Sequence, residues 1–220
     1  MRSFLIALTL AFITTQARAV LITPTGVTED AGGHFSSFVA THLIDDSGLS
    51  GAANMVNYTT ITHAPSGGAV SWVTPAFFPD YFAGGGTTPV HTFDLGGTFD
   101  LTDVVAWNYG CGGGCPGNAA ETITATFSTT GTGGAFGSPT TFILPFAEGP
   151  AHTVSLGGTI QANAVRFTYD TNRVVGAGGD RIGLSELKFI GSAPVPEAST
   201  CALAILGLFG LGRSTRRRAA

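Results

Sequence analysis

Short runs of apolar and β-branched residues alternate along the chain with clusters of glycine, proline, asparagine and aspartate. No window between residues 20 and 193 shows the sustained 3.6-residue period of an amphipathic helix. Residues 121–127 instead alternate threonine with apolar side chains, and residues 165–170 alternate in a similar way, which is typical of strands with one buried face. The pattern therefore predicts an all-β domain of antiparallel strands, built as a sandwich or a barrel.

The apolar runs predict about eight main strands. The strongest covers residues 99–108, and a pair of glycines separates it from the run before it. The segments from which the strands are drawn are residues 20–22, 55–61, 70–73, 90–95, 99–108, 121–127, 140–144, 152–156, 164–169 and 184–190.

The first 19 residues have the pattern of a secretory signal peptide. Arg2 precedes an apolar run over residues 4–13, and Ala17-Arg18-Ala19 forms a small-x-small cleavage site. We expect signal peptidase to cleave after Ala19, so that the mature chain starts at Val20 and is exported.

The chain ends in a proline-containing motif, an uncharged apolar run and a cluster of arginines. The uncharged run is about 15 residues, whereas a helix needs roughly 20 to span a membrane. The long side chain of the first arginine can extend the run by reaching toward the lipid headgroups, and positive charge at this end is expected to stay in the cytoplasm. A buried core helix is the alternative, which the arginines disfavour. The motif residues are Val195, Pro196 and Glu197, and the arginines are Arg213, Arg216, Arg217 and Arg218.

This order of motif, apolar run and arginine cluster over residues 194–220 resembles the PEP-CTERM sorting signal of Gram-negative bacteria. Ala198 stands where that family usually has a second proline. The resemblance implies a short transmembrane helix that anchors the protein transiently in the inner membrane. It also implies recognition and cleavage by a membrane exosortase, which would leave the protein at the cell surface or in the extracellular matrix.

Residues 20–193 form one domain's length of chain, long enough to bury a core. They contain four of the ten basic residues and 13 of the 14 acidic ones, a formal net charge of −9, and no Lys or Arg lies between Val20 and Val165. Such a surface repels phosphate backbones, so nucleic acid is a poor partner. It suits cations and neutral polar ligands such as glycans.

Two of the three cysteines, Cys111 and Cys115, bracket a triplet of glycines. In an oxidising compartment this spacing favours a small loop closed by a disulfide. Free thiols are the alternative, and a zinc site would need about four ligands at spacings that the sequence does not offer.

A second resemblance concerns the exported domain. Residues 93–97 with 101–108, and residues 164–167 with 182–189, resemble strand pairs of discoidin-type, galactose-binding-like domains; in the first half of the domain only residues 43–48 match. That family has an eight-stranded jelly-roll β-sandwich, which the expected strands allow. The resemblance implies an antiparallel sandwich of this type.

Many galactose-binding-like modules hold a structural Ca²⁺ between an early loop and a glutamate near the last strand. By position, the matching residues here are Asp45, Asp46 and Glu186. Carboxylate oxygens from two distant segments suit Ca²⁺, which takes six to eight oxygen ligands. The alternative is that the two aspartates belong to a turn and that Glu186 pairs with Lys188 or Arg181.

An aromatic loop over residues 77–82, with Trp72 beside it, is the candidate contact surface, because sugars stack on exposed rings. We expect Phe77 and Phe78 to be buried in the core. Trp72 and Tyr81 are the candidate ligand contacts, because their N–H and O–H groups allow the rings to lie partly exposed to water. Trp107 lies on the apolar side of a strong strand and is expected in the core.

Catalytic patterns are lacking in the sequence. The five histidines lack metalloprotease spacing, and no Gly-x-Ser-x-Gly elbow or phosphate-binding loop occurs. We therefore expect a non-catalytic, exported module associated with glycan or exopolysaccharide. The alternatives are a structural surface or matrix protein without a specific ligand, and a glycan-active hydrolase whose paired carboxylates only the fold could bring together.

Overall fold

The computed structural model describes residues 18–65, 70–174 and 178–194. Residues Ala19–Pro194 form one compact unit. The predicted sorting motif at Val195–Glu197, its arginine cluster and nearly all of the predicted signal peptide lie outside the described residues. Within the described part, no helix has the length and apolar character needed to cross a membrane.

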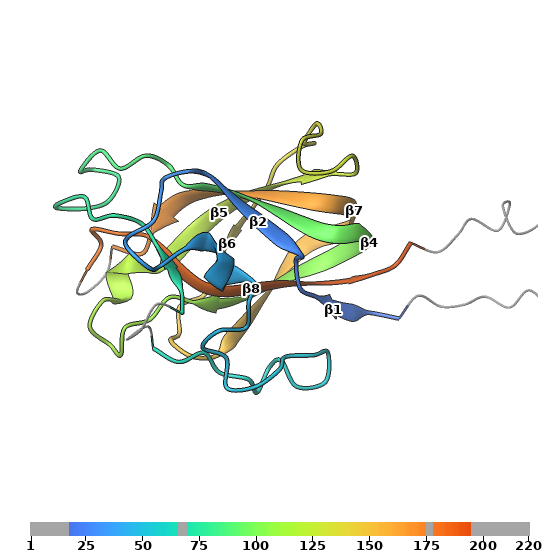
Figure 1. The fold of residues 1–220 in the computed structure, drawn as a ribbon, viewed down its shortest axis with the longest axis horizontal. Coiled ribbons are helices and arrows are strands. Elements are labelled where there is room, and N and C mark those ends of the chain that lie inside the picture. Colours follow the sequence, from blue (N-terminus) through green and yellow to red (C-terminus); the bar gives the residue numbers. More distant parts are fainter. Residues whose placement is uncertain (1–17, 66–69, 175–177, 195–220) are drawn as a thin grey trace, which may run out of the picture. The chain divides into compact units, whose positions relative to one another are not determined.

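The unit is built from eight strands and two short 3₁₀ helices (Figure 1). The strands of this unit pair antiparallel, as the sequence pattern predicted. The elements are β1 (Val20–Ile22), β2 (Gly26–Ala31), η1 (Ala40–Leu43), β3 (Trp72–Val73), β4 (Val90–Asn108), η2 (Pro116–Asn118), β5 (Ala120–Ser128), β6 (Thr140–Ile143), β7 (Ala151–Asn172) and β8 (Gly183–Ser192).

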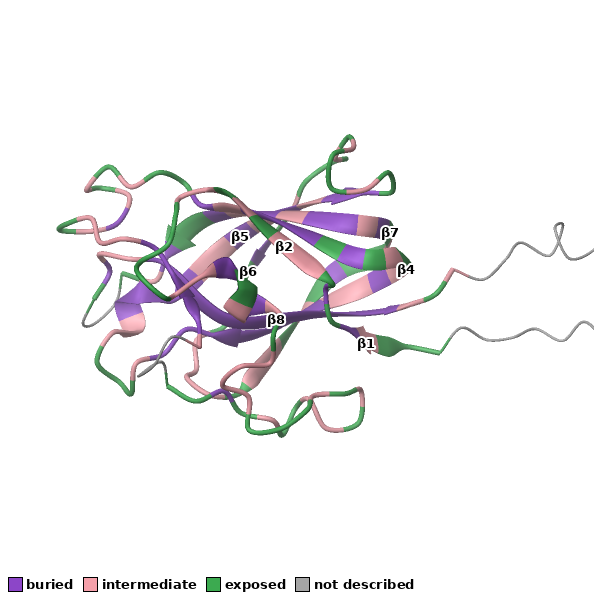
Figure 2. Cartoon of the chain, in the orientation of Figure 1, coloured by how far each residue is buried: buried purple, intermediate pink, exposed green. Residues whose placement is uncertain are grey.

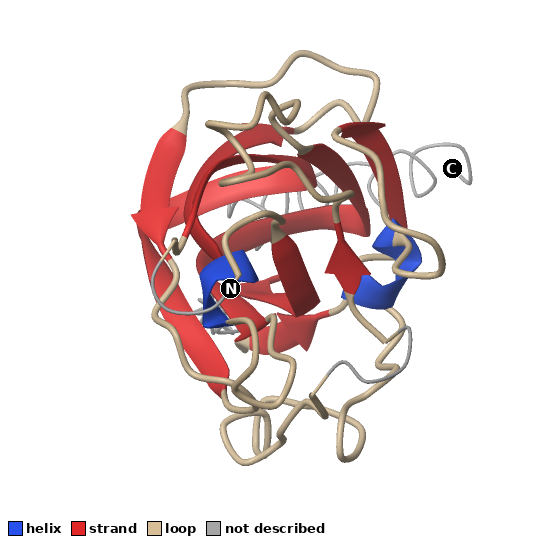
Figure 3. Cartoon of the chain, turned by 90° about the vertical axis from the view of Figure 1, so that its left-hand side faces the viewer, coloured by secondary structure: helices blue, strands red, loops and turns tan. Residues whose placement is uncertain are grey.

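The two longest strands, β4 and β7, pair with each other along their lengths and contribute to both layers of the sandwich. The first half of β4, up to Asp94, lies between β2 and the second half of β7, and this layer continues through β5 to β6. The second half of β4, from Asp100, lies between β8 and the first half of β7. β8 also pairs with β1 and β3. Figure 3 shows the strands curving around a shared interior.

Each long strand is interrupted by the same four-residue sequence, Leu-Gly-Gly-Thr, at residues 95–98 of β4 and 156–159 of β7. The register between the two strands shifts at both places. The first glycine of each copy has a positive φ, +72° at Gly96 and +79° at Gly157, a conformation that costs glycine little. The two copies are therefore bulges at which the paired strands bend.

The sequence pattern predicted one strand before and a separate strand after each of these glycine pairs, over residues 90–95 and 99–108 and over residues 152–156 and 164–169. That prediction was wrong, because strand pairing continues beyond each bulge. Glycine pairs are typical of loops, but they also allow a strand to bend without ending.

Aromatic rings form the middle of the core between the two layers. Phe93 of β4, Phe167 of β7 and Phe189 of β8 are fully buried and meet edge to face, with ring centroids 5.3 to 6.5 Å apart. Edge-to-face contacts of this kind add to the gain from burying the rings. Figure 2 shows that the buried residues concentrate on the strands and the exposed ones in the loops.

A second apolar cluster, formed by Val105, Trp107 and Ile190, lies on the opposite face of β4 under the segment of residues 49–61. Trp107 is fully buried, as predicted, and its indole N–H donates a hydrogen bond of 2.9 Å to the carbonyl of Ile61.

Residues 55–61 were predicted as a strand but form turns. The side-chain oxygens of Asn54 and Asn57 accept hydrogen bonds from the backbone N–H groups of Val56 and Asn54. Local bonds of this type compete with strand pairing.

Candidate functional site

Two of the three predicted calcium ligands, Asp46 and Glu186, contact the side chain of Lys188. The ammonium of Lys188 lies 2.5 Å from Asp46 Oδ1 and 3.5 Å from Glu186 Oε1, and it donates a 2.9 Å hydrogen bond to Thr23 Oγ1. Asp45, the third predicted ligand, accepts a hydrogen bond from the backbone N–H of Ser47 and pairs with His42 instead. The alternative in which Glu186 pairs with Lys188 is therefore the arrangement observed.

This oxygen set does not fit Ca²⁺ in its present arrangement. The ammonium of Lys188 already takes one oxygen from each of three residues, whereas Ca²⁺ needs six to eight oxygen ligands. Among the described residues, no group of three His, Cys, Asp or Glu side chains is placed to hold a metal ion. Glu186 is fully buried, and burial raises the pKa of its carboxyl to about 8 although Lys188 acts in the opposite direction.

The two predicted ligand-contacting aromatics are both in the core. Trp72 and Tyr81 are 0% exposed. The indole N–H of Trp72 donates to Glu29 Oε1 at 2.8 Å, and the Tyr81 hydroxyl donates to the carbonyl of Thr87 at 2.7 Å. Because their polar edges are bonded inside the domain, neither ring can stack on a ligand in this structure, and the expectation is corrected.

The two neighbouring phenylalanines, Phe77 and Phe78, differ in burial, although both were expected in the core. Phe77, predicted to be buried, is partly buried and packs against the core. Phe78, also predicted to be buried, is 77% exposed. The reason is the chain path, since the backbone N–H of Phe77 bonds to Asp180 and fixes Phe77 inward, while the next side chain points to solvent.

Three loop segments converge at one end of the sandwich around Arg181. The backbone N–H groups of Thr74, Phe77 and Tyr81 donate to the carbonyls of Ile182, Asp180 and Gly179 at 2.7 to 2.9 Å. A third segment joins where Phe35 N–H donates to the carbonyl of Val73 at 2.8 Å. These main-chain bonds fix loops from distant parts of the sequence to one another.

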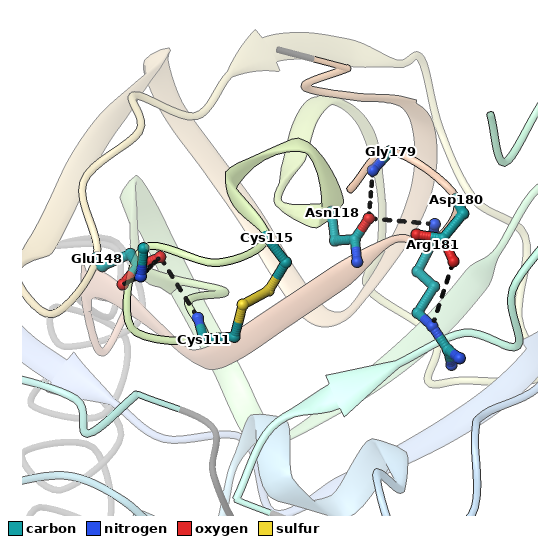
Figure 4. Close-up of a disulfide and its surroundings, with 8 residues drawn as sticks. Cys111, Cys115, Asn118, Glu148, Gly179, Asp180 and Arg181 are labelled. Atoms are coloured by element: carbon teal, nitrogen blue, oxygen red, sulfur yellow. Dashed lines mark hydrogen bonds and ion pairs between the residues drawn. A yellow bond between two sulfur atoms is a disulfide. The ribbon is translucent and has the colours of Figure 1, made fainter. Parts of the chain in front are cut away.

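The backbone of Gly179 and Arg181, on either side of Asp180, is held by two buried asparagines. Asn118 Oδ1 accepts from the backbone N–H groups of Gly179 and Arg181, and Asn172 Nδ2 donates to the carbonyls of the same two residues. Figure 4 shows Asn118 between the disulfide loop and Arg181. The asparagines thus satisfy the polar groups of a buried loop backbone.

The Arg181 side chain lies between an aromatic ring and a carboxylate. Its guanidinium carbon is 4.1 Å from the centre of the Phe35 ring, which is 45% exposed. Its Nε lies 3.7 Å from Asp180 Oδ2, and another guanidinium nitrogen donates to the carbonyl of Thr74 at 3.2 Å. We call Phe35, Phe78, Asp180 and Arg181 the Arg181 surface.

The disulfide between Cys111 and Cys115 is present, as predicted. The Glu148 carboxylate accepts hydrogen bonds from the backbone N–H groups of Cys111 and Gly113 across this loop (Figure 4). The N–H of Asn118 bonds to the carbonyl of Cys115 at 3.0 Å. The closed loop therefore leads directly into the turn that carries Asn118.

Only one member of the Arg181 surface was reached from the sequence, because Phe78 lies in the aromatic loop named as the candidate contact surface, although it was expected to be buried. Phe35 has no pattern that separates it from core phenylalanines, and Asp180 and Arg181 lie in a glycine-rich loop. One signal was available, because Arg181 is one of only three arginines in residues 20–193. All three stack on phenylalanine rings, the other pairs being Arg166 with Phe136 and Arg173 with Phe146.

No family model matches the chain, and no curated protein matches it. Solved carbohydrate-binding modules share its fold. The CBM32-3 module from a family 31 glycoside hydrolase of Clostridium perfringens has a TM-score of 0.51 at 13% identity, covering 78% of this chain and 91% of that chain. The CBM32-1 and CBM32-2 domains of Clostridium perfringens ZmpB give a TM-score of 0.50 at 12% identity, covering 76% of this chain and 34% of that chain.

Identities this low carry information about the fold alone. The domain is an all-β, antiparallel, eight-stranded sandwich that resembles the galactose-binding-like fold of CBM32 modules. The predicted fold class is confirmed at this level.

Proposed function

We propose that the domain is a non-catalytic module that binds a glycan through the Arg181 surface. The observation that carries this proposal is the exposed Phe35 ring, 4.1 Å from the guanidinium carbon of Arg181, whose carboxylate partner is Asp180. The exposed Phe78 lies in the adjoining loop, one residue after Phe77, whose backbone N–H donates to the carbonyl of Asp180. The likeness of the fold to carbohydrate-binding modules supports the same class of ligand.

The chemistry of this surface suits a sugar. Arg181 can donate hydrogen bonds to ring hydroxyls and Asp180 can accept them, while Phe78 and Phe35 offer apolar faces to the C–H side of the ring. Main-chain and asparagine hydrogen bonds hold these groups in place before any ligand arrives, which lowers the entropic cost of binding. The net negative charge of the domain favours a neutral glycan over an anionic one.

The binding test compares the purified protein with two pairs of variants, using the extracellular polysaccharide of the producing cells as the ligand. We expect Arg181→Ala and Phe78→Ser each to weaken binding by tenfold or more, equivalent to about 1.4 kcal/mol. Arg166→Ala is the matched control for the first variant, because Arg166 stacks on Phe136 at the same 4.1 Å distance. Val56→Ser is the control for the second, since Val56 is 88% exposed in a different loop.

Equal losses in the variants and their controls would refute the assignment of the site. Absence of saturable binding by the unaltered protein would favour the alternative of a structural surface or matrix protein. Hydrolysis of the polysaccharide by the purified protein would instead favour the hydrolase.

We also propose that the protein reaches this glycan by export. The support is the sequence of its two ends, where signal peptidase and an exosortase would act in turn, with the inner membrane as a transient anchor. Mass spectrometry of the protein recovered outside the cell tests this route. Protein that begins at Val20 and lacks the Arg213–Arg218 cluster is expected, and an intact tail on that material would contradict sorting.

A further inference from the structure

Lys188 on β8 is completely buried, which is rare for a lysine unless its charge is paired. Its ammonium reaches oxygens of three residues that are far apart in the sequence. Thr23 follows β1, Asp46 lies in the turn after η1, and Glu186 is two residues before Lys188 on the same face of β8. The lysine therefore ties the edge of the sheet to an early loop from inside.

We propose that Lys188 serves as a built-in cation, and that removing its ammonium converts the surrounding oxygens into a binding site for a divalent cation. The cradle consists of Thr23 Oγ1, Asp46 Oδ1 and the Glu186 carboxylate. With Lys188 in place, the protein needs no metal ion to hold these three segments together.

The geometry of the donors supports this proposal. An ammonium has three N–H donors, and three oxygens lie 2.5, 2.9 and 3.5 Å from Lys188 Nζ. Hydroxyl and carboxylate oxygens are also the ligands that Ca²⁺ prefers. Water can supply the remaining ligands once the long lysine side chain is replaced by a short one.

An unpartnered oxygen gives independent support. Glu186 Oε2 is buried and has no hydrogen-bond partner, and such an atom carries a free-energy penalty. Lys188 Nζ contacts one oxygen of Asp46 and one of Glu186, whereas a divalent ion could engage the unpartnered oxygen of Glu186 as well. The cradle thus holds more acceptor capacity than one ammonium can satisfy.

The backbone of Asp46 is also set for this role. Its φ is +61°, in the left-handed region that non-glycine residues adopt infrequently. The N–H of Leu49 bonds to the carbonyl of Asp46 at 3.2 Å, which closes the turn. The turn thereby fixes the backbone from which the Asp46 carboxylate reaches Lys188.

The test measures thermal unfolding of the purified protein in EDTA and in millimolar CaCl₂. We expect the same melting temperature for the unaltered protein in both solutions. Lys188→Ser leaves space and a further oxygen, so we expect it to melt lower in EDTA and to recover by about 5 °C or more in CaCl₂. Lys188→Met fills the space with an apolar side chain and is expected to show no response to Ca²⁺.

Three results would overturn the proposal. One is a fall in the melting temperature of the unaltered protein in EDTA, or Ca²⁺ binding by that protein in calorimetry. Another is a Lys188→Ser variant that Ca²⁺ neither stabilises nor folds. The third is a Ca²⁺ response that survives in the double variant Glu186→Gln with Lys188→Ser, because the ion would then bind elsewhere. None of these readouts depends on glycan binding, so they are independent of the function proposed above.

Discussion

The indole N–H of Trp72 donates a 2.8 Å hydrogen bond to the Glu29 carboxylate, which makes Trp72 a structural residue of the core. Its ring lies 4.4 Å from the ring of His91 and 5.0 Å from that of Tyr169. His91 Nδ1 is 3.1 Å from the Tyr169 hydroxyl. Polar atoms of β2, β3, β4 and β7 therefore meet inside one end of the sandwich, and the tryptophan is part of that network.

Trp72→Phe removes the N–H donor to Glu29 and leaves a small cavity. We expect a loss of about 2 kcal/mol or more in the free energy of unfolding, measured by urea denaturation, with glycan binding largely retained. Phe78→Ser is the control, because its ring is at the surface, and it should change stability by less than about 0.5 kcal/mol. Similar losses of stability from both changes would contradict the assignment of Trp72 to the core.

The same network predicts a dependence of stability on pH. Burial raises the pKa of Glu29, but the neighbouring His91 and His34 imidazoles and the hydrogen bond from Trp72 outweigh it and lower the pKa from 4.5 to about 2. His34 makes the closest of these contacts, at 2.6 Å, whereas His91 Nε2 is 3.9 Å away, beyond hydrogen-bond distance. The folded state therefore favours the ionised carboxylate.

A carboxyl whose pKa is lower in the folded state stabilises the protein above its unfolded pKa, and this contribution is lost as the pH falls. For Glu29 the loss is expected between about pH 4.5 and pH 2. Glu29→Gln keeps an acceptor for Trp72 but cannot ionise, so its free energy of unfolding should fall less steeply in this window. Parallel pH profiles for the two proteins in urea denaturation would refute the role of Glu29.

Several features of the fold could be predicted from the sequence because they depend on local pattern. The alternation in β5 and the apolar run in the second half of β4 each mark a strand, and both are observed. The Cys111–Cys115 loop could be predicted because only four positions separate the two thiols. β2 was not predicted, because its sequence, Gly-Val-Thr-Glu-Asp-Ala, has few apolar residues and obtains its place by pairing with β4.

The candidate site could not be predicted because it depends on the environment of side chains and not on their type. Trp72 was predicted at the surface because a tryptophan N–H can bond to water or a ligand. In the structure this N–H donates instead to Glu29, which lies 43 positions away in the sequence, inside the core. Asp46 and Glu186 were predicted as ligands of one metal ion, and both contact Lys188. The sequence could not show that Lys188, although named as a possible partner, would lie between them.

The disulfide loop is expected to support both stability and the position of Arg181. Replacing Cys111 and Cys115 by serine opens a five-residue ring and should lower the free energy of unfolding by about 2 kcal/mol. The loop also precedes Asn118, which bonds the backbone of Arg181. If the proposed function holds, glycan affinity should fall by up to about tenfold.

Reduction of the unaltered protein should reproduce both effects of the double serine variant. Calorimetric binding and urea denaturation, with and without a reductant, provide the measurements. A loss of stability with unchanged affinity would show that Asn118 keeps its place without the disulfide.

The glycines of the two Leu-Gly-Gly-Thr bulges offer a graded test of how the long strands bend. At Gly96 the φ is positive and an added Cβ would lie 2.5 Å from Thr25 Cγ2, so both strain and a clash oppose alanine. At Gly157 the φ is also positive but an added Cβ meets no atom within 4 Å, so only strain opposes it. At Gly158 neither obstacle exists.

We therefore expect Gly96→Ala to destabilise the protein most, Gly157→Ala by about 1 kcal/mol, and Gly158→Ala least, or to stabilise it slightly because alanine restricts the unfolded chain. Urea denaturation of the three variants gives the order directly. Equal effects at Gly157 and Gly158 would mean that the left-handed turn of β7 is not required in the folded state. The bend in that strand would then have to come from the register shift alone.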